Sequence, residues 1–397
     1  MPNNRLISLD AFRGFTIALM IVVNDPGSWA YVYPPLRHAS WHGITPTDFV
    51  FPFFLFIVGV SIVLAFSRRA GEVPNSQLIR KIFKRTAIIF GLGLFLALFP
   101  EFKFAEIRIP GVLQRIALVF MACSFLFLYT NWRQQAWIAA GLLVGYWLLM
   151  ALVPVPIDEV IRKALATGEV VRSHGTVVSV NLPARIGEGF IAGNFEPGIN
   201  LQAWLDRLLV PGRLYENAWD PEGLLSTLPA IGTGLLGMLA GHTILYVPNR
   251  ERKVMVLLLG GFIAMTIGNV WDWFFPFNKN LWSSSFVMYT GGLSAMTLGT
   301  LYWLVDIEGH RRWTWVGIVF GANAITAYVL HGMLGRLFTI KFGSGEAAWT
   351  IKGAWMDGLM GWGFSGEFAS LLWALAYTAL CFLPIWLLYR RKVFIKI

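Results

Sequence analysis

The polar residues from 24 to 48 are the strongest candidates for chemistry in this sequence. His38 and His42 lie four residues apart in "LRHASWHGITPTDF", and Asp48 directly precedes a long apolar run. A histidine titrates near neutral pH and can take a proton from an amine or hydroxyl nucleophile. A carboxylate can hold the other ring nitrogen and fix the tautomer, as in a Ser-His-Asp triad. This segment therefore predicts His38 as a general base that Asp48 orients.

Asn24 adds an amide to this cluster, at the end of the first apolar segment. Such an amide can donate to a developing oxyanion, a contact that removes several kcal/mol from an acyl-transfer barrier. Two other interpretations stay open. His38 and His42 could bind a metal ion with Asp48, although the flanking prolines and glycine disfavour a regular helix and no cysteine is nearby. The histidines could also cap helix ends and face water.

Two arginines lie in "RIPGVLQR", where another apolar segment begins. Arg108 precedes a Pro-Gly helix start, and Arg115 falls about two turns into the apolar segment. A buried arginine is costly and normally pairs with a carboxylate or with a phosphate or carbonyl of a ligand. Both arginines are therefore candidates for ligand binding. The alternative is an ion pair with Asp10, Asp48 or Glu222.

Asn280, Asn323 and His331 complete the candidates. Asn280 in "NKNLWSSS" could instead cap a helix. Asn323 and His331 are eight residues apart in "GANAITAYVLHG", so both could face the same interior of a helix bundle. A lone intramembrane histidine can also be a packing residue. No Walker motif, dinucleotide fingerprint or G-x-S-x-G elbow stands out in the sequence.

Membrane-spanning helices are the elements that must position these residues. The chain has 397 residues, of which 56% are hydrophobic and only 14% charged, against roughly 25% charged residues in average soluble proteins. About ten segments are long enough for a ~30 Å hydrocarbon core. We expect an all-α polytopic membrane protein with one domain over residues 1–397. The predicted spans lie near 6–24, 49–66, 83–100, 110–129, 135–153, 227–247, 253–275, 283–305, 313–335 and 367–389.

The distribution of basic residues predicts the orientation of these spans. The net charge is +10. Lys and Arg concentrate in the loops that share one side with the N-terminus, such as "SRRAGEVPNSQLIRKIFKR" and "PNRERK", and in the tail "RRKVFIKI". Basic residues in short loops mark the cytoplasmic side. Both termini are therefore predicted to be cytoplasmic, His38 faces the exoplasmic side, and the charge reflects topology rather than nucleic-acid binding.

The long connection over residues 154–226 is predicted to lie on the exoplasmic side. It contains "LQAWLDRLLVPGRLYE", whose apolar spacing predicts a short amphipathic helix that Pro211 and Gly212 end. A long connection without structure is unusual unless it is functional. We expect a partly folded lid on the exoplasmic mouth, and a mobile loop without function is the alternative.

Seven stretches resemble the heparan-α-glucosaminide N-acetyltransferases and their bacterial relatives, a group of transmembrane acyltransferases. They are "SLDAFRG", "HASWHGITPTDFVFPFFLFIVGVSI", "RIPGVLQR", "DRLLVPGRLYE", "AWDPEGLLSTLPAI", "NKNLWSSSFV" and "RRKVFIKI", in family order. The resemblance implies an enzyme that takes acetyl-CoA from the cytoplasm and acetylates a glucosamine amine on the other side, without a metal. It implies that His38 is catalytic, that Asn24 takes part and that Asp48 matches a family aspartate.

Two mechanisms are implied for such a family, transfer through an acetyl-histidine or direct transfer with the histidine as base. We favour direct transfer, because a neutral imidazole deprotonates an ammonium well. CoA is expected to enter from the basic cytoplasmic face, where Arg and Lys can bind its phosphates. We expect Arg108 and Arg115 as ligand contacts ahead of the other three candidates, and the resemblance allows a homodimer.

The resemblance also bears on where the protein acts. The lysosomal enzyme has a luminal segment and an extra span before its "FRG" helix, whereas this chain begins at Met1 close to that helix. We therefore expect the shorter bacterial form in a plasma or inner membrane, with a wall-derived or imported glucosamine as acceptor. The alternative function is an amino-sugar transporter that uses the same polar cluster as its binding site.

Overall fold

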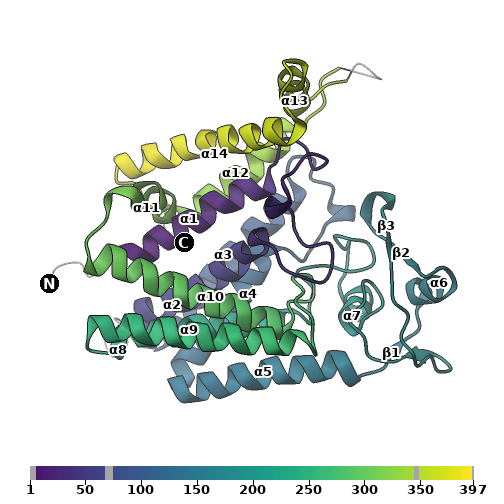
Figure 1. Cartoon of the computed structure of the whole chain (residues 1–397), viewed down its shortest axis with the longest axis horizontal. Coiled ribbons are helices and arrows are strands. Elements are labelled where there is room, and N and C mark those ends of the chain that lie inside the picture. The colour runs from purple at the N-terminus through teal and green to yellow at the C-terminus, as the bar shows by residue number, and fades with distance from the viewer. Residues whose placement is uncertain (1–5, 68–74, 344–347, 396–397) are drawn as a thin grey trace.

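The computed structural model describes residues 6–67, 75–343 and 348–395. In these residues most of the regular structure is helical, and each of the two small sheets has two strands. The long helices run roughly in one direction, while the strands and two short helices gather at one end of the molecule (Figure 1).

The bundle takes its helices from both halves of the chain. Each predicted span coincides with one of them, or with the α11–α12 pair in the case of residues 313–335. The first half contributes α1 (Ile7–Asn24), α2 (Val50–Ser67), α3 (Asn75–Leu98), α4 (Val112–Tyr129) and α5 (Trp132–Leu152). The second half contributes α8 (Thr227–Tyr246), α9 (Arg250–Asp272), α10 (Ser284–Leu301), α11 (Trp315–Ala322), α12 (Ala324–Phe338) and α14 (Gly366–Arg390).

Seven helices of the described chain are long and apolar enough to cross a membrane, and the bent α11–α12 pair brings the number to eight. Two predicted spans are not in this set. Helix α3 carries Lys81, Lys84 and Arg85 in its middle, and α10 is rich in Ser, Thr and Gly. The structure confirms a mostly helical chain with several helices that could cross a membrane, while the count of about ten spans stays a prediction.

Helices α2 and α8 touch backbone to backbone. A Cβ atom on Gly59 would lie 2.0 Å from the carbonyl oxygen of Gly234, and one on Gly237 would lie 2.0 Å from that of Phe56. Small residues allow such close approach between helices in membranes. Fully buried side chains such as Leu55 fill the space on either side of this contact. The packing fixes the direction of α2, whose N-terminal end carries Asp48.

The start of α1 is capped by a distant residue. The backbone N–H groups of Ile7 and Ser8 donate to the carboxylate of Asp306 at 3.3 and 3.1 Å. Asp306 lies in a short π-helix, η5 (Tyr302–Ile307), which continues α10. A carboxylate at a helix N-terminus satisfies unpaired N–H groups and complements the helix dipole.

The connection between α5 and α8 is a folded unit at one end of the bundle (Figure 1). The predicted amphipathic helix is present as α7, and it ends just before Val210 and Pro211. The unit contains β1 (Val155–Pro156), α6 (Glu159–Thr167), β2 (Glu169–Val171), β3 (Val177–Ser179), β4 (Phe190–Ile191) and α7 (Leu201–Leu209). Strand β1 pairs with β4, and β2 with β3, both antiparallel.

This unit shares an apolar core with the bundle. Ile161, Ile191 and Ile199 are fully buried, and they belong to one cluster with Tyr146 of α5 and Phe275 beyond α9. Burial of apolar surface is the main stabilising term in such a contact. The connection is therefore a folded unit packed against α5 and the segment after α9, and not an unstructured loop.

Candidate active site

The loop between α1 and α2 carries His38, and its first part is held on α14. The backbone N–H of Gly27 donates to the carbonyl oxygen of Ser370 at 3.2 Å, and that of Ser28 donates to the Ser370 hydroxyl at 3.1 Å. A 3₁₀ turn, η1 (Pro34–Leu36), follows and leads into Arg37 and His38.

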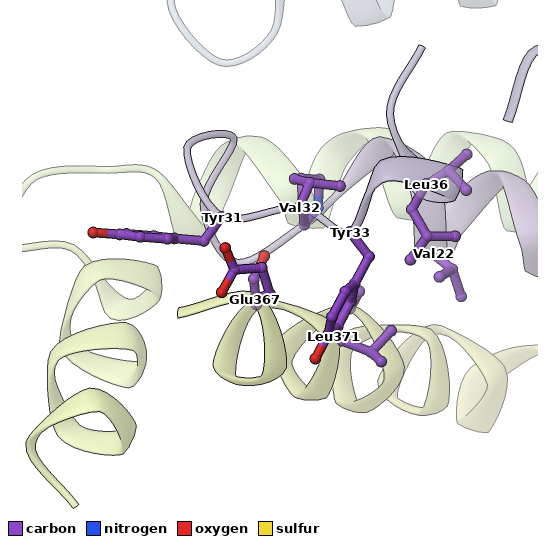
Figure 2. Close-up of a pocket in the computed structure, with 11 residues that line it drawn as sticks. Val22, Tyr31, Val32, Tyr33, Leu36, Glu367 and Leu371 are labelled. Atoms are coloured by element: carbon purple, nitrogen blue, oxygen red, sulfur yellow. The ribbon is translucent and has the colours of Figure 1, made fainter. Parts of the chain in front are cut away.

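A small pocket lies where this loop covers α14. Val22 of α1, Tyr33 and Leu36 of the loop, and Glu367 and Leu371 of α14 line it, and Figure 2 shows Tyr33 pointing toward α14. None of the candidate site residues lines this pocket. We interpret this pocket as part of the contact that holds the loop on α14. His38 lies outside it and contacts Asp48, just before α2.

Asp48 is held in one orientation by its own turn. It lies in η2 (Pro46–Phe49) immediately before α2 and is 1% exposed. Its Oδ2 atom accepts the backbone N–H groups of Ala39 and Thr45 at 3.2 and 3.0 Å. The contact with Thr45 is a capping box, a motif that the sequence "TPTD" encodes locally. The carboxylate is thereby fixed with Oδ1 directed at His38.

His38 meets that carboxylate directly, as the sequence predicts. Its Nδ1 atom lies 2.6 Å from Asp48 Oδ1. Because an ionised carboxylate only accepts hydrogen bonds, Nδ1 carries the proton and Nε2 keeps a lone pair. Burial lowers the pKa of His38, the hydrogen bond to Asp48 opposes this, and the charge of Lys279 lowers the pKa further. The net lowering keeps the imidazole neutral near pH 7, the form that a general base requires.

Lys279 is the main residue of this site that the sequence did not single out. Its Nζ atom lies 3.1 Å from Nδ1 and 3.2 Å from Nε2 of His38, and 3.9 Å from Asp48 Oδ1. Burial lowers the pKa of Lys279, against the attraction of Asp48 and Glu222. A lysine in an otherwise buried turn, "FNKNLW", was the available signal, because a basic residue is expensive there without a partner.

The turn that carries Lys279 is tightly bonded and lies against the His38 loop. The buried side-chain oxygen of Asn278 accepts the backbone N–H of Leu281 at 2.8 Å, and the backbone N–H of Asn278 donates to the Ser283 hydroxyl at 3.0 Å. The N–H of Gly43 donates to the carbonyl oxygen of Phe277 at 2.8 Å. These bonds join two segments far apart in sequence and explain why Lys279 and His38 meet.

His42 faces a different environment from His38. Its Nδ1 lies 3.4 Å from the side-chain nitrogen of Asn278. It lines an open groove of about 650 Å³ against the folded connection, together with Asn194 and Glu196. Among the described residues no three His, Cys, Asp or Glu side chains are grouped closely enough to hold a metal ion. His38 and His42 therefore do not converge on Asp48.

Arg108 forms the ion pair that the sequence left as an alternative. Its guanidinium contacts Asp220 at 2.8 and 2.7 Å and Glu222 at 2.5 Å. Burial lowers the pKa of Arg108, but the two carboxylates outweigh it and raise the pKa above its usual range. The pair joins the segment before α4 to the segment before α8. Because both carboxylates contact Arg108, its charge is already compensated.

Arg115 is buried in α4 and only partly paired. Its Nη2 donates to the carbonyl oxygen of Gly223 at 3.0 Å and to the Ser226 hydroxyl at 2.5 Å. Its guanidinium lies 5.3 Å from the ring centre of Trp282. Within the described chain, its Nε and Nη1 have no hydrogen-bond partner. Buried unpaired N–H groups are costly, so these two atoms could bind the carbonyl or phosphate of a ligand.

Asn323 and His331 contact different partners in the structure. Asn323 marks a 75° bend between α11 and α12, where its amide bonds the backbones of Val393 and Ile395 at 3.1 and 2.9 Å. His331 instead lies beside Asp25, with Nδ1 and Oδ2 3.0 Å apart. The bend lies at Asn323 itself, and α12 continues from there past His331, so both buried side chains belong to one helix.

The two remaining candidates are asparagines. Asn24 is the last residue of α1, is exposed, and directly precedes Asp25. The side chain of Asn280 is half-buried, and its backbone oxygen accepts from the amide of Gln202 at 3.1 Å. The polar contacts of His38 are therefore with Asp48 and Lys279, and not with either asparagine.

Comparisons with known proteins bear on this geometry. Residues 5–161 match the family model for the catalytic region of heparan-alpha-glucosaminide N-acetyltransferase. The chain is 28% identical to the Homo sapiens protein of that name, over 99% of this chain and 60% of that protein. It is 27% identical to the Mus musculus protein, over 99% of this chain and 61% of that protein. The chain thus spans about three-fifths of these curated relatives. It is a relative of the heparan-alpha-glucosaminide N-acetyltransferases, which confirms the resemblance seen in its motifs.

Proposed function

We propose that this protein is a transmembrane N-acetyltransferase that moves an acetyl group from acetyl-CoA to the amine of a glucosamine-type sugar. The contact of 2.6 Å between His38 and Asp48 is the observation that carries the proposal. It lies in the segment that matches the catalytic region of the family. The relatives are named for N-acetylation of a glucosaminide, which supports the choice of acceptor.

Direct transfer fits this geometry best. The neutral amine of the sugar attacks the thioester carbonyl, the N–C bond forms and the C–S bond breaks. His38 Nε2 takes the proton that the nitrogen loses and passes it to the departing thiolate. Asp48 stabilises the imidazolium that forms in between, as the carboxylate of a catalytic triad does. Asn24 remains our candidate donor to the oxyanion, since it ends the helix that leads into the His38 loop.

The unpaired N–H groups of Arg115 support this residue as a contact for the acyl donor. Arg108 ranks second as a contact for the acyl donor, because two carboxylates already compensate its charge. Asn280 and His331 are further candidates, whereas Asn323 is committed to the C-terminal tail. The groove beside His42 supports an approach of the sugar between the loop and the folded connection.

We also propose the orientation in the membrane. About ten spans, with both termini in the cytoplasm and the connection 154–226 outside, would place His38 near the exoplasmic surface of a plasma or inner membrane. The start of α1 and the end of α14 lie at the end of the bundle opposite to α6 and α7, which agrees with this assignment (Figure 1). The arm of acetyl-CoA then has to reach from the basic cytoplasmic face toward His38. A homodimer is compatible with this assignment.

A transporter of amino sugars is the second candidate. The bend of 75° between α11 and α12 favours it, because transporters often build substrate sites at discontinuous helices. Transport predicts accumulation of glucosamine in proteoliposomes without CoA, and acetyl transfer predicts strict dependence on acetyl-CoA.

The experiment that tests the proposal uses purified protein in detergent with radiolabelled acetyl-CoA, with and without glucosamine. We expect N-acetylglucosamine from the wild-type protein and a loss of roughly 10²-fold or more in His38→Ala. Binding of CoA without transfer to any amino sugar would leave the acyl donor right and the acceptor wrong. Absence of CoA binding, together with uptake of glucosamine, would establish the transporter.

A further inference from the structure

Lys279 places a primary amine against the ring of His38. The amine lies 3.2 Å from Nε2, the ring atom that keeps a lone pair because Nδ1 is engaged with Asp48. Nζ is also 3.1 Å from Nδ1, so it lies over the ring, and a rotation of the lysine side chain would bring an N–H toward the Nε2 lone pair. The base then lies within hydrogen-bond distance of both the amine and the orienting carboxylate, an order of groups that activates nucleophiles in covalent catalysis.

The surroundings direct this amine into the site. The Lys279 side chain is 24% exposed, and its backbone oxygen accepts the N–H of Trp282 at 3.2 Å within the turn. Asn278 before it is fully buried and fixed by its own hydrogen bonds. The backbone position of Lys279 is thus as well defined as that of His38.

Burial, rather than the charges around the pair, favours a reactive amine. Asp48 and Glu222 are the charged groups that act on both His38 and Lys279. Burial lowers the pKa of Lys279, while these two carboxylates oppose the change. A lowered pKa increases the fraction of neutral amine, which is the form that attacks a carbonyl carbon.

The amine of Lys279 has the same chemistry as the acceptor of the proposed reaction. An amino sugar must present its nitrogen to His38 Nε2 for the proton to be removed, and Lys279 Nζ lies next to that position, 3.2 Å from Nε2. We propose that Lys279 is a site of self-acetylation, modified when the acyl donor binds without an acceptor. This inference rests on the proposed acetyltransferase function.

The chemical step balances in the same way as transfer to the sugar. The neutral Nζ of Lys279 attacks the thioester carbonyl, so that an N–C bond forms and the C–S bond breaks. His38 takes the proton from nitrogen and passes it to the thiolate, which leaves as CoA thiol. The product is an amide that is stable in water, so it would occupy the place of the acceptor nitrogen and slow later turnover.

Peptide mapping after incubation without acceptor tests the inference. Wild-type protein is incubated with acetyl-CoA, digested and examined by mass spectrometry for acetylation at Lys279 and at Lys103. Lys103 is the internal control, because its exposed amine pairs with Glu101 and lies away from His38. A parallel sample with glucosamine present measures N-acetylglucosamine.

We expect acetylation of Lys279 well above that of Lys103, suppressed by glucosamine and lowered roughly 10²-fold or more in His38→Ala. Product formation on glucosamine with Lys279 no more acetylated than Lys103 would overturn the inference and leave the proposed function intact. Label found only on the His38 peptide, and labile to alkali, would overturn it in favour of an acetyl-histidine. If neither glucosamine nor Lys279 is acetylated, the proposed function fails and the inference fails with it. The comparison of Lys279 with Lys103 uses wild-type protein alone, so it does not depend on the folding of the His38→Ala variant.

Discussion

The Nδ1 atom of His38 lies 2.6 Å from Oδ1 of Asp48, while the other carboxylate oxygen accepts two backbone N–H groups. The carboxylate therefore has a fixed orientation that does not depend on the histidine. The imidazole is oriented by Asp48, with Nε2 left for a reacting group.

Asp48→Asn is expected to lower the turnover number by roughly 10²- to 10⁴-fold. The amide has nearly the same size, but it does not hold the tautomer or stabilise the imidazolium. The measurement is the rate of N-acetylglucosamine formation at saturating acetyl-CoA. Asp357→Asn is the matched control, because Asp357 is exposed in α13 (Ile351–Gly361), and its rate should equal that of wild type. Equal rates for the two variants would exclude Asp48 from the chemistry.

The pH dependence of the reaction should reflect the base. Burial lowers the pKa of His38, so its protonation, which stops it acting as a base, should occur below the usual value of roughly 6.5. We expect kcat/KM to be constant near pH 7 and to fall on the acid side with a midpoint below that value. Asp48→Asn removes the contact that raises the pKa, so the midpoint should move to still lower pH. A wild-type midpoint at or above 6.5 would contradict this assignment.

Arg108→Gln should destabilise the protein by about 2–3 kcal/mol, because it leaves the carboxylates of Asp220 and Glu222 without their cation. Thermal unfolding in detergent measures the effect as a lower Tm. Lys103→Gln is the control on the same segment, since its ion pair with Glu101 is exposed and its loss should leave the Tm nearly unchanged. If both variants unfold at the same temperature, the Arg108 pair does not join the two segments.

Gly59→Ala should destabilise the bundle by about 1–3 kcal/mol or more, because the new Cβ would lie 2.0 Å from the backbone oxygen of Gly234. Gly91→Ala in α3 is the matched control, since a Cβ there meets no atom within 4 Å. That change should be neutral or slightly stabilising, because alanine favours helix. The yield of folded protein and its Tm compare the two, and a tolerant Gly59 would mean that α2 and α8 can separate.

Local sequence signals predicted the parts of the site that lie within one loop. His38 and Asp48 are ten residues apart, and the turn "TPTD" fixes their relation through a capping box. Hydrophobic length likewise predicted the helices, because the bilayer imposes a minimum run of apolar residues. The short helix α7 followed from its amphipathic spacing and its proline stop.

Contacts between distant segments were not predictable in the same way. Lys279 meets His38 across 241 residues, and Arg108 meets Asp220 across 112. No local spacing encodes such pairs, since they depend on how the bundle packs. The predicted span over residues 313–335 shows the opposite case, because an apparently continuous apolar pattern contains a 75° bend at Asn323.

Two hydrogen-bonded contacts between distant segments constrain the order in which the bundle can fold. One caps α1, and the other joins Asn323 to the segment after α14. The N–H groups in the first turn of α1 cannot be capped before Asp306 is present. The amide of Asn323 likewise cannot bond before Val393 and Ile395 are present. On a ribosome, the first helix would enter the membrane long before its cap has been synthesised. We expect α1 to be fixed in the bundle only after the segment with Asp306 has been synthesised, about 300 residues later.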